Sequence, residues 1–311
     1  MTQAPGLHFY MNLMAFDSLP ENSAAPRGTR EEQFEGIREA GFEGVQFAGA
    51  GSVHELSFCR SAGLGFAGSG RINRPSEAKA LAAEAAGSGY DCLTLHLGWG
   101  IESNDEAFRL IESVLEAALQ THLPLYIETH RATICQDMWR TVEFVKRFPD
   151  MRFNGDFSHW YAGQEMVYGG FEPKLRYIQP VVERVRFIHG RIADAGCIQV
   201  PVQEGSTCLL HFEEMWTACF GAYLQTEPER MFCFTPELLS PAIHYARTVN
   251  GFEITDRWDE SLLLIRIADK CFLNAATRGA SAREAAGQMD PMDTLGGLSE
   301  TEQSADFLHR E

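Results

Sequence analysis

The segment LPLYIETHRATICQDMWRTVEFVKRFPDMRFNGDF (123–157) decides the fold. It begins with an apolar run at 123–130, continues through an amphipathic stretch at 135–148, and ends in a second apolar run at 151–157. The short runs have the length of buried strands, and the amphipathic stretch has the period of a helix. A strand, a helix and a strand in this order are typical of a parallel sheet with crossover helices.

The same alternation continues toward both ends of the chain. We expect strands at residues 8–16, 44–48, 64–68, 90–99, 123–130, 151–157, 185–192 and 231–238. We expect helices at residues 30–40, 53–62, 75–86, 105–119, 135–148, 172–184, 212–224 and 259–276, with Pro180 kinking or ending the sixth. Strands that start about thirty residues apart predict an α/β fold, a closed (β/α)8 TIM barrel.

An open doubly wound sheet is the alternative architecture. It would usually place a glycine-rich phosphate loop after the first strand, and residues 16–28 do not form one. The segment GFAGSGRI (65–72) is interpreted as a strand followed by a turn. A loop of roughly twenty residues after 185–192 is long enough to suggest a functional loop. We expect residues 1–278 to form the barrel and residues 279–311 to form an acidic tail that is flexible or docked on a partner.

The composition limits the possible partners and the compartment. Of 311 residues, 45% are hydrophobic and 22% are charged, which is typical of a packed protein, and the net charge is −17. An acidic chain without a basic run is expected to bind no nucleic acid. No apolar run is long enough to span a membrane, and the first residues lack a secretory signal, so we expect a cytoplasmic protein with no membrane association. The 8 cysteines form no CxxC pair and lie mostly in apolar runs, which favours free thiols over disulfides or a zinc knuckle.

Polar side chains lie where the last four expected strands end. They are Glu128, Asp156, His189 and Glu237, one from each consecutive unit. Any one of them alone would ordinarily be a solvated or hydrogen-bonded strand end. The carboxyl ends of barrel strands meet at one mouth, so four such groups would repel and would be costly to bury unpaired. A divalent cation removes both difficulties, and three carboxylates with one imidazole favour Mn²⁺, with Mg²⁺, Co²⁺ or Zn²⁺ possible.

Four motifs carry a resemblance to a known family. The segments IETHR (127–131), GDFSHW (155–160), FIHGRI (187–192) and FTPELL (234–239) resemble the xylose isomerase-like barrel superfamily, specifically its sugar phosphate isomerase/epimerase group. The resemblance covers roughly residues 8–276. It implies one divalent metal held by Glu128, Asp156, His189 and Glu237, with Glu128 and Glu237 as the catalytic acid/base pair. It also implies that His159 contacts a substrate hydroxyl. The best-studied epimerases carry an acidic residue three positions after the corresponding histidine and an arginine six positions after it. This sequence differs, because His189 is followed two residues later by Arg191.

Further residues near the strand ends are candidates for substrate binding. They are His96, Trp99, His130, Arg131, His159 and Arg191. The aromatic residues Trp99, Trp160 and Tyr161 either line a sugar-sized pocket or pack in the core and loops.

The expected activity is that of a metal-dependent isomerase or epimerase of a small carbohydrate. A carboxylate would remove a proton beside a carbonyl, through a metal-stabilised enediolate, and a second carboxylate would return it. The same intermediate can expel a leaving group, so a lyase or dehydratase is the alternative. A phosphodiesterase of the apurinic endonuclease kind or a non-catalytic binding subunit is less favoured. A homo-oligomer or a partner subunit is possible.

Overall fold

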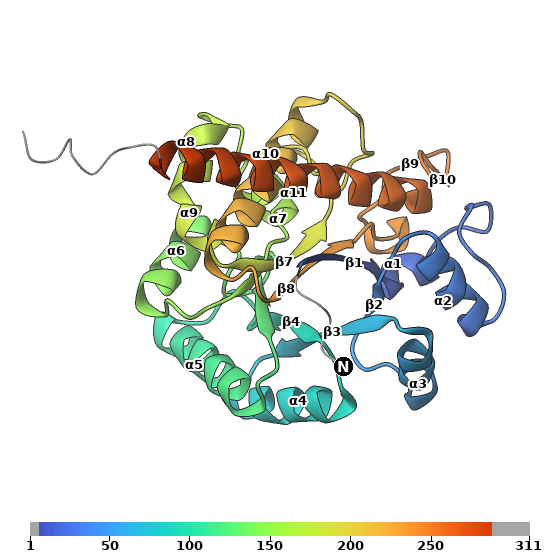
Figure 1. The fold of residues 1–311 in the computed structure, drawn as a ribbon, viewed down its shortest axis with the longest axis horizontal. Helices are drawn as coiled ribbons and strands as arrows, with labels where there is room; N and C mark the ends of the chain where they lie inside the picture. The colour runs from blue at the N-terminus through green and yellow to red at the C-terminus, as the bar shows by residue number, and fades with distance from the viewer. Residues whose placement is uncertain (1–5, 288–311) are drawn as a thin grey trace, which may run out of the picture.

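The chain folds into a closed barrel of parallel strands with helices around its outside (Figure 1). This computed structural model describes residues 6–287. The strands follow chain order around the barrel, and β1 closes it by pairing with β8. Their bounds are β1 Gly6–Asn12, β2 Gly44–Phe47, β3 Gly65–Ile72, β4 Cys92–Leu97, β5 Leu125–Glu128, β6 Phe153–Asn154, β7 Val185–Gly190 and β8 Met231–Pro236. The predicted (β/α)8 barrel is therefore confirmed.

The connections between strands contain the helices. Their bounds are α1 Leu13–Asp17, α2 Arg30–Glu39, α3 Val53–Ala62, α4 Pro75–Ser88, α5 Asn104–Thr121, α6 Met138–Arg147, α7 Ser158–Gly163, α8 Phe171–Tyr177, α9 Gln179–Val182, α10 Thr207–Thr226 and α11 Arg257–Gly287. The connection after β8 adds a short 3₁₀ helix, η1 Pro241–Ile243, and a small hairpin of β9 Thr248–Val249 and β10 Phe252–Glu253.

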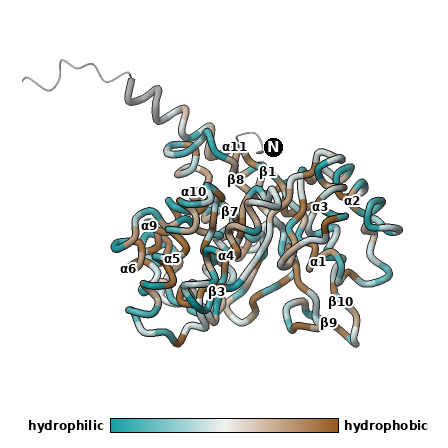
Figure 2. The backbone as a smooth tube through the Cα atoms, turned by 90° about the horizontal axis from the view of Figure 1, so that it is seen from below, coloured by the Kyte–Doolittle hydropathy of each residue, from teal (hydrophilic) through white to brown (hydrophobic). Residues whose placement is uncertain are grey.

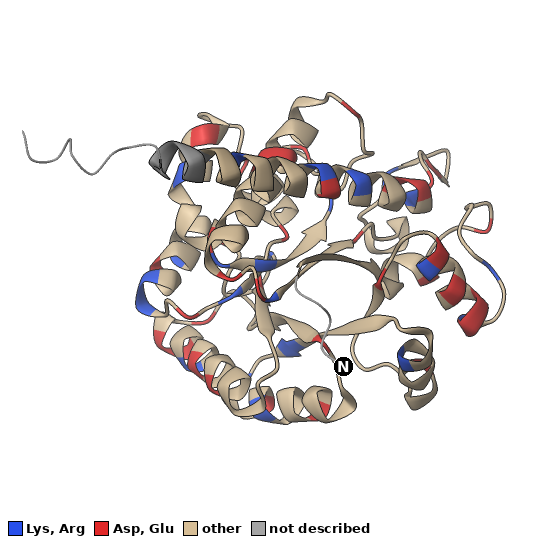
Figure 3. Cartoon of the chain, viewed as in Figure 1, with Lys and Arg blue, Asp and Glu red and all other residues tan. Residues whose placement is uncertain are grey.

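Local sequence signals account for the helix ends and for the helix faces. The Ser103 side chain accepts from the backbone of Glu106, whose carboxylate bonds back to Ser103, so a capping box starts α5. The helix then buries one face, which includes Leu110 and Ile111. Figure 2 shows hydrophilic and hydrophobic residues alternating along the helices. Lys, Arg, Asp and Glu are spread over the outer helices, such as α2, α5 and α11 (Figure 3).

Two apolar clusters hold the barrel together. The larger one lies between the strands and the helices. The smaller one is contributed by β1, β3, β4, β5, β7 and β8 and consists of Tyr10, Ala67, Cys92, Tyr126, Phe187 and Cys233. Tyr10 also donates a hydrogen bond of 2.8 Å to Asp91 Oδ2. Because side chains alternate along a strand, Tyr10 and Asn12 point into the same interior at successive levels. The apolar layer thus supports the polar carboxyl ends of the strands, which we call the rim.

Several predicted boundaries differ from the structure. Residues 13–16 belong to helix α1 rather than to the first strand, because the Asn12 side chain accepts from the backbone N–H of Ala15 and starts a helix there. The glycine-rich segment expected to turn is part of β3, which extends to Ile72. The short helix α7 was not predicted. Helix α10 begins at Thr207, so the preceding loop is shorter than expected. The predicted break near Pro180 is confirmed, since Pro180 lies in the first turn of α9.

The C-terminal helix continues beyond the predicted end of the barrel. Helix α11 reaches Gly287, so it includes the first residues of the predicted tail, and the remainder of that tail lies outside the described residues. The two-part division at residue 279 stays a prediction. All cysteines are free, as predicted. Across residues 6–287, none of the helices is both long and apolar enough to cross a membrane.

Candidate active site

Buried polar side chains are concentrated at the rim of the barrel. Parallel strands bring all their carboxyl ends to this rim, where active sites of this architecture lie. The buried polar residues found there are Asn12, Gln46, Thr94, Glu128, Asn154, Asp156, His159, His189 and Arg191. Such groups are costly to bury unless they are bonded to one another or to a ligand, so their contacts define the site.

Glu128 ends β5, and its two carboxylate oxygens face different neighbours. Oε1 lies 3.2 Å from His96 Nε2, while Oε2 lies 3.4 Å from His189 Nδ1 and accepts a hydrogen bond of 3.0 Å from Asn154 Nδ2. Burial opposes ionisation of Glu128, which is 2% exposed, yet His96 and His189 hold its pKa well below the usual range. Glu128 is therefore a carboxylate at neutral pH.

Asp156 follows β6 and is completely buried. The guanidinium of Arg191 contacts its Oδ2, and His159 Nε2 lies 3.3 Å from the same oxygen. The hydroxyl of Ser158 donates to the other oxygen, Oδ1. Burial opposes ionisation here too, but Arg191 and His159 hold the pKa of Asp156 well below its usual range.

His189 lies at the centre of the rim, with each ring nitrogen facing a different environment. Its Nε2 is 3.0 Å from Gln46 Oε1, an oxygen that can only accept, so Nε2 carries a proton. Its Nδ1 is 3.4 Å from Glu128 Oε2 and 3.5 Å from Glu237 Oε2. Burial disfavours the charged ring, but Glu237 and Glu128 raise the pKa of His189 to about 9. Nδ1 is thus the nitrogen directed at the carboxylates.

Glu237 directly follows β8 and is the most accessible of the four predicted ligands, with 13% of its side chain exposed. Its Oε2 accepts a hydrogen bond of 2.5 Å from Arg191 Nη2. Its Oε1 accepts a weaker bond of 3.4 Å from Asn12 Nδ2. Glu237 therefore lies between the buried rim and the open mouth of the barrel.

The four predicted ligands are brought together in one place. Donor atoms of Asp156, His189 and Glu237 lie within 4.8 Å of one another, and Glu128 joins them through its contact with His189 Nδ1. Ligand atoms on one cation, each about 2.1 Å from it, lie roughly 3–4 Å apart. Three carboxylates and an imidazole, whose second nitrogen is held by Gln46, form a donor set suited to one hard divalent cation. The residues present therefore fit a metal, although Arg191 Nη2 contacts two of the donors.

Three histidines form a stack beside this cluster: His96 lies in β4, His130 follows β5, and His159 lies in α7. The ring centroids of His96 and His130 are 4.1 Å apart, and those of His130 and His159 are 4.0 Å apart. Burial and the neighbouring His159 lower the pKa of His130 to about 3, so His130 is neutral. Nδ1 of the buried His159 makes no hydrogen bond to another described residue, whereas its Nε2 forms the ion pair of 3.3 Å with Asp156 Oδ2. The stack therefore offers an unsatisfied ring nitrogen next to the carboxylates, as a substrate site would.

The other predicted substrate-binding residues differ in how deeply they are buried below the protein surface. Trp99 is 55% exposed and packs under Arg71, whose Cζ is 4.2 Å from the ring centroid. Arg131 is exposed, and its Cζ is 5.2 Å from the ring of Tyr245. Arg191 is buried against the carboxylates of Asp156 and Glu237. Trp160 and Tyr161 are completely buried, which settles their open assignment in favour of core packing.

Several residues of the rim were not found from the sequence. Gln46 accepts from Asn12 Nδ2 at 2.9 Å and donates to Thr94 Oγ1 at 3.0 Å, and Asn154 bonds to Glu128. A single amide inside an apolar strand, as in GVQF (44–47), was the available signal. Tyr245 was also missed, because it lies in the irregular connection after β8.

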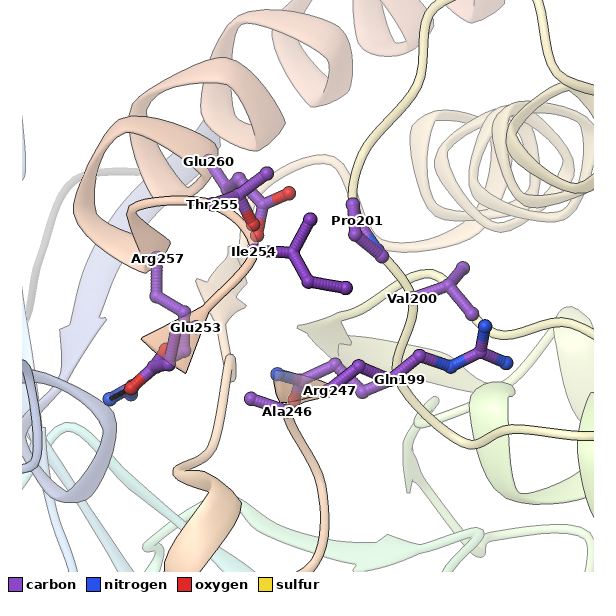
Figure 4. Close-up of a pocket in the computed structure, with 10 residues that line it drawn as sticks. All are labelled: Gln199, Val200, Pro201, Ala246, Arg247, Glu253, Ile254, Thr255, Arg257 and Glu260. Carbon is purple, nitrogen blue, oxygen red and sulfur yellow. Dashed lines mark hydrogen bonds and ion pairs between the residues drawn. The ribbon is translucent and has the colours of Figure 1, made fainter. Parts of the chain in front are cut away.

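A separate pocket lies between the connections that follow β7 and β8 (Figure 4). It is lined by Gln199, Val200, Pro201, Ala246, Arg247, Glu253, Ile254, Thr255, Arg257 and Glu260. Its free space is about 10 Å³, enough for about one water molecule. This pocket is too small for a sugar and contains none of the predicted site residues.

Comparisons with known proteins support the barrel fold. No family model matches the chain, and no curated protein matches it. The crystal structure of the probable 3-DHS dehydratase AsbF from Bacillus anthracis matches with a TM-score of 0.53 and 16% identity, covering 74% of this chain and 92% of that one. A D-tagatose 3-epimerase-like protein matches with a TM-score of 0.54 and 12% identity, covering 85% and 98%. The barrel fold that the family resemblance predicts is thus confirmed, and identities this low carry no more than the fold.

Proposed function

We propose that this chain is a metal-dependent enzyme that moves a proton on the carbon beside a carbonyl of a carbohydrate, giving isomerisation or epimerisation. The observation that supports this most directly is the convergence of Glu128, Asp156, His189 and Glu237 at the rim. The similar epimerase-like and dehydratase structures are consistent with a barrel used for chemistry on small polyols.

The four convergent residues would hold one divalent metal, for which we propose Mn²⁺, with Mg²⁺, Co²⁺ or Zn²⁺ as alternatives. When bound, such an ion supplies Lewis-acid polarisation of substrate oxygens. The remaining work belongs to the side chains of this chain. They must remove a weakly acidic proton, return it, and hold the sugar at the correct distance.

Glu128 and Glu237 are proposed as the proton-transfer pair. Both approach His189 Nδ1, at 3.4 Å and 3.5 Å, so they flank one small volume. Glu128 is held as a carboxylate by His96 and His189, and is therefore in the state that accepts a proton. Glu237 is closer to the mouth, where an incoming substrate can reach it. Return of the proton to the same carbon gives an epimer, and return to the neighbouring carbon gives an isomer.

Binding of the substrate is proposed to use the residues around this pair. They are His96, Trp99, His130, Arg131, His159 and Arg191. The Nδ1 of His159, which has no hydrogen-bond partner among the described residues, suits a sugar hydroxyl, which can both donate and accept. The half-exposed ring of Trp99 suits the apolar face of a sugar at the mouth.

The test is metal analysis of the dialysed protein, followed by a panel of ketoses with and without phosphate in D₂O. We expect a stoichiometric divalent metal and incorporation of deuterium beside the carbonyl of at least one substrate. E237Q should abolish conversion of the substrate to its epimer or isomer, because Glu128 would then have no partner to return the proton. The matched control is E43Q, because Glu43 pairs with His8 at the opposite end of the barrel, and it should exchange at the wild-type rate. Turnover by E237Q with its metal retained would remove Glu237 from the mechanism.

Elimination is the second candidate reaction. A probable dehydratase is among the similar structures, and loss of a hydroxyl from the adjacent carbon can follow the same proton removal. The two outcomes differ in the product, because isomerisation preserves the mass of the substrate and elimination lowers it by one water. A non-catalytic binding subunit or a phosphodiesterase would show no exchange on any ketose.

A further inference from the structure

Arg191 has contacts that are unusual for a residue expected to bind a substrate. Its side chain is completely buried, and its single nitrogen Nη2 contacts Asp156 Oδ2 and lies 2.5 Å from Glu237 Oε2. Its Nε donates to Ser158 Oγ at 3.1 Å. One guanidinium therefore bridges two of the proposed metal ligands, which come from two different strands.

The position of Nη2 conflicts with a metal held by the same oxygens. Asp156 and Glu237, which Nη2 contacts, are two of the three residues whose donor atoms lie within 4.8 Å of one another, so a cation held by them would lie close to Nη2. Two positive charges would then share the same small, buried volume, where water screens them poorly. Repulsion between the guanidinium and the metal therefore opposes simultaneous contact of both cations with Asp156 Oδ2 and Glu237 Oε2.

The remaining contacts of Arg191 differ from those of a permanent structural ion pair. Buried guanidinium groups normally have their donors satisfied, yet Nη1 is buried and makes no hydrogen bond to another described residue. The ring of Tyr245 lies 4.6 Å from Arg191 Cζ and also borders the exposed Arg131. This ring offers the guanidinium a surface along which it can move toward the mouth while keeping a favourable cation–π contact.

We infer that Arg191 is a tethered cation that competes with the divalent metal for Asp156 and Glu237, and that it leaves them when the metal binds. Arg191 thereby lowers the affinity of the site for metal and holds the two carboxylates together in the metal-free protein. This inference rests on the proposed metal-dependent function. Arg191 is a positioning residue here, since it acts through the ligands.

The test compares Mn²⁺ binding to metal-stripped wild type, R191M and R131M by titration calorimetry. R191M removes the charge but keeps an unbranched apolar chain, and it should bind Mn²⁺ about tenfold more tightly or better, because the competing charge is gone. Its metal-free form should melt at a lower temperature than wild type, since two buried carboxylates lose their partner. R131M is the matched control, because Arg131 borders the same Tyr245 ring without touching a carboxylate of the site, and its affinity should equal that of wild type.

The outcomes separate this inference from the proposed function. Equal or weaker Mn²⁺ binding by folded R191M, with wild type binding normally, overturns the competition but leaves the metal site intact. Binding by R191M alone supports the competition and overturns metal dependence in the native protein. Binding by neither protein overturns both.

A measurement on wild type covers the case in which R191M does not fold. The Nε–H signal of Arg191 in a nitrogen–proton NMR spectrum, assigned by its absence in R191K, should shift when diamagnetic Mg²⁺ is added, because its guanidinium changes partners. An unchanged signal at saturating Mg²⁺ would overturn the inference.

Discussion

Replacing Gln46 by Met tests whether the rim orients His189 for binding a metal. Gln46 is completely buried, and its Oε1 accepts from His189 Nε2 at 3.0 Å and from Asn12 Nδ2 at 2.9 Å. Met has a similar length but offers no comparable acceptor. In Q46M the imidazole loses the contact that directs Nδ1 at the carboxylates.

The size of the effect follows from these contacts. Loss of the hydrogen bond that orients a metal-binding histidine typically costs about 10–100-fold in metal affinity. That range corresponds to about 1.4–2.7 kcal/mol of binding free energy. Two buried donors also lose their acceptor, at about 1–3 kcal/mol each, so the free energy of unfolding should fall as well. Both quantities are measurable, by Mn²⁺ titration of the metal-stripped protein and by urea unfolding.

T94V is the control that separates orientation from stability. The Thr94 hydroxyl accepts from Gln46 Nε2 at 3.0 Å, on the side of the amide away from His189. T94V should therefore lower the free energy of unfolding by about 1–3 kcal/mol while leaving the affinity for Mn²⁺ nearly unchanged. Wild-type affinity in Q46M would refute the reasoning, and so would an equal loss of affinity in both variants.

Three further predictions concern the metal, an outer ion pair and the barrel backbone. Mn²⁺ at about 100 times its dissociation constant should stabilise wild type by about 2.7 kcal/mol, whereas D156N should show almost no rise in melting temperature. E227Q should lower the free energy of unfolding at neutral pH by about 1.5–3 kcal/mol, because Glu227 bonds to Arg152 and Arg186. Despite partial burial, these arginines lower the pKa of Glu227 from 4.5 to about 2. The stabilisation that ionised Glu227 provides is therefore complete above pH 4.5 and is lost as the pH falls through 2. The urea midpoints of E227Q and wild type should converge over that interval. G44A should destabilise the barrel by about 1–3 kcal/mol in urea unfolding, because a Cβ there would lie 2.6 Å from the Gly65 carbonyl oxygen. The control is G87A on α4, which should be neutral or stabilising because a Cβ there meets nothing within 4 Å.

The order of strands and helices could be predicted from the sequence because each strand is a short apolar run between longer amphipathic ones. Errors arose where packing decides the local structure. Gly68 and Gly70 suggested a turn, yet they lie within β3, where a Cβ at Gly68 would be 2.8 Å from Leu93 and one at Gly70 would be 2.7 Å from Leu81. Glycine is needed at these two positions because a larger side chain would clash with its neighbours, and not because the backbone turns there. Spacing along the sequence does not reveal such a packing requirement.

The candidate site, like the fold, could be predicted from the sequence only in part. Glu128, Asp156, His189 and Glu237 were predictable as neighbours because parallel strands bring their ends to one rim. Their roles as ligands and catalysts stay predictions. Gln46 and Asn12 could not be paired from the sequence, since their hydrogen bond depends on the register between β1 and β2, in which Asn12 lies beside Gln46. An amide in an apolar strand, such as that of Gln46, can be assigned to the site only once its hydrogen-bond partner is known.

The sequence predicts Arg191 as a substrate contact, but strand geometry also places it beside His189 and its neighbours. Residues 189 and 191 are two apart, so if the strand continues, both side chains point into the barrel. Three carboxylates and one histidine predict a divalent cation, but the guanidinium of Arg191 contacts two of these carboxylates. With Arg191 included, two of the carboxylates already have a positive partner without any metal. The affinity of this site for metal is therefore a difference between two cations competing for the same oxygens, and a sequence with Arg two residues after the strand-seven histidine should bind metal more weakly than its donor set alone predicts.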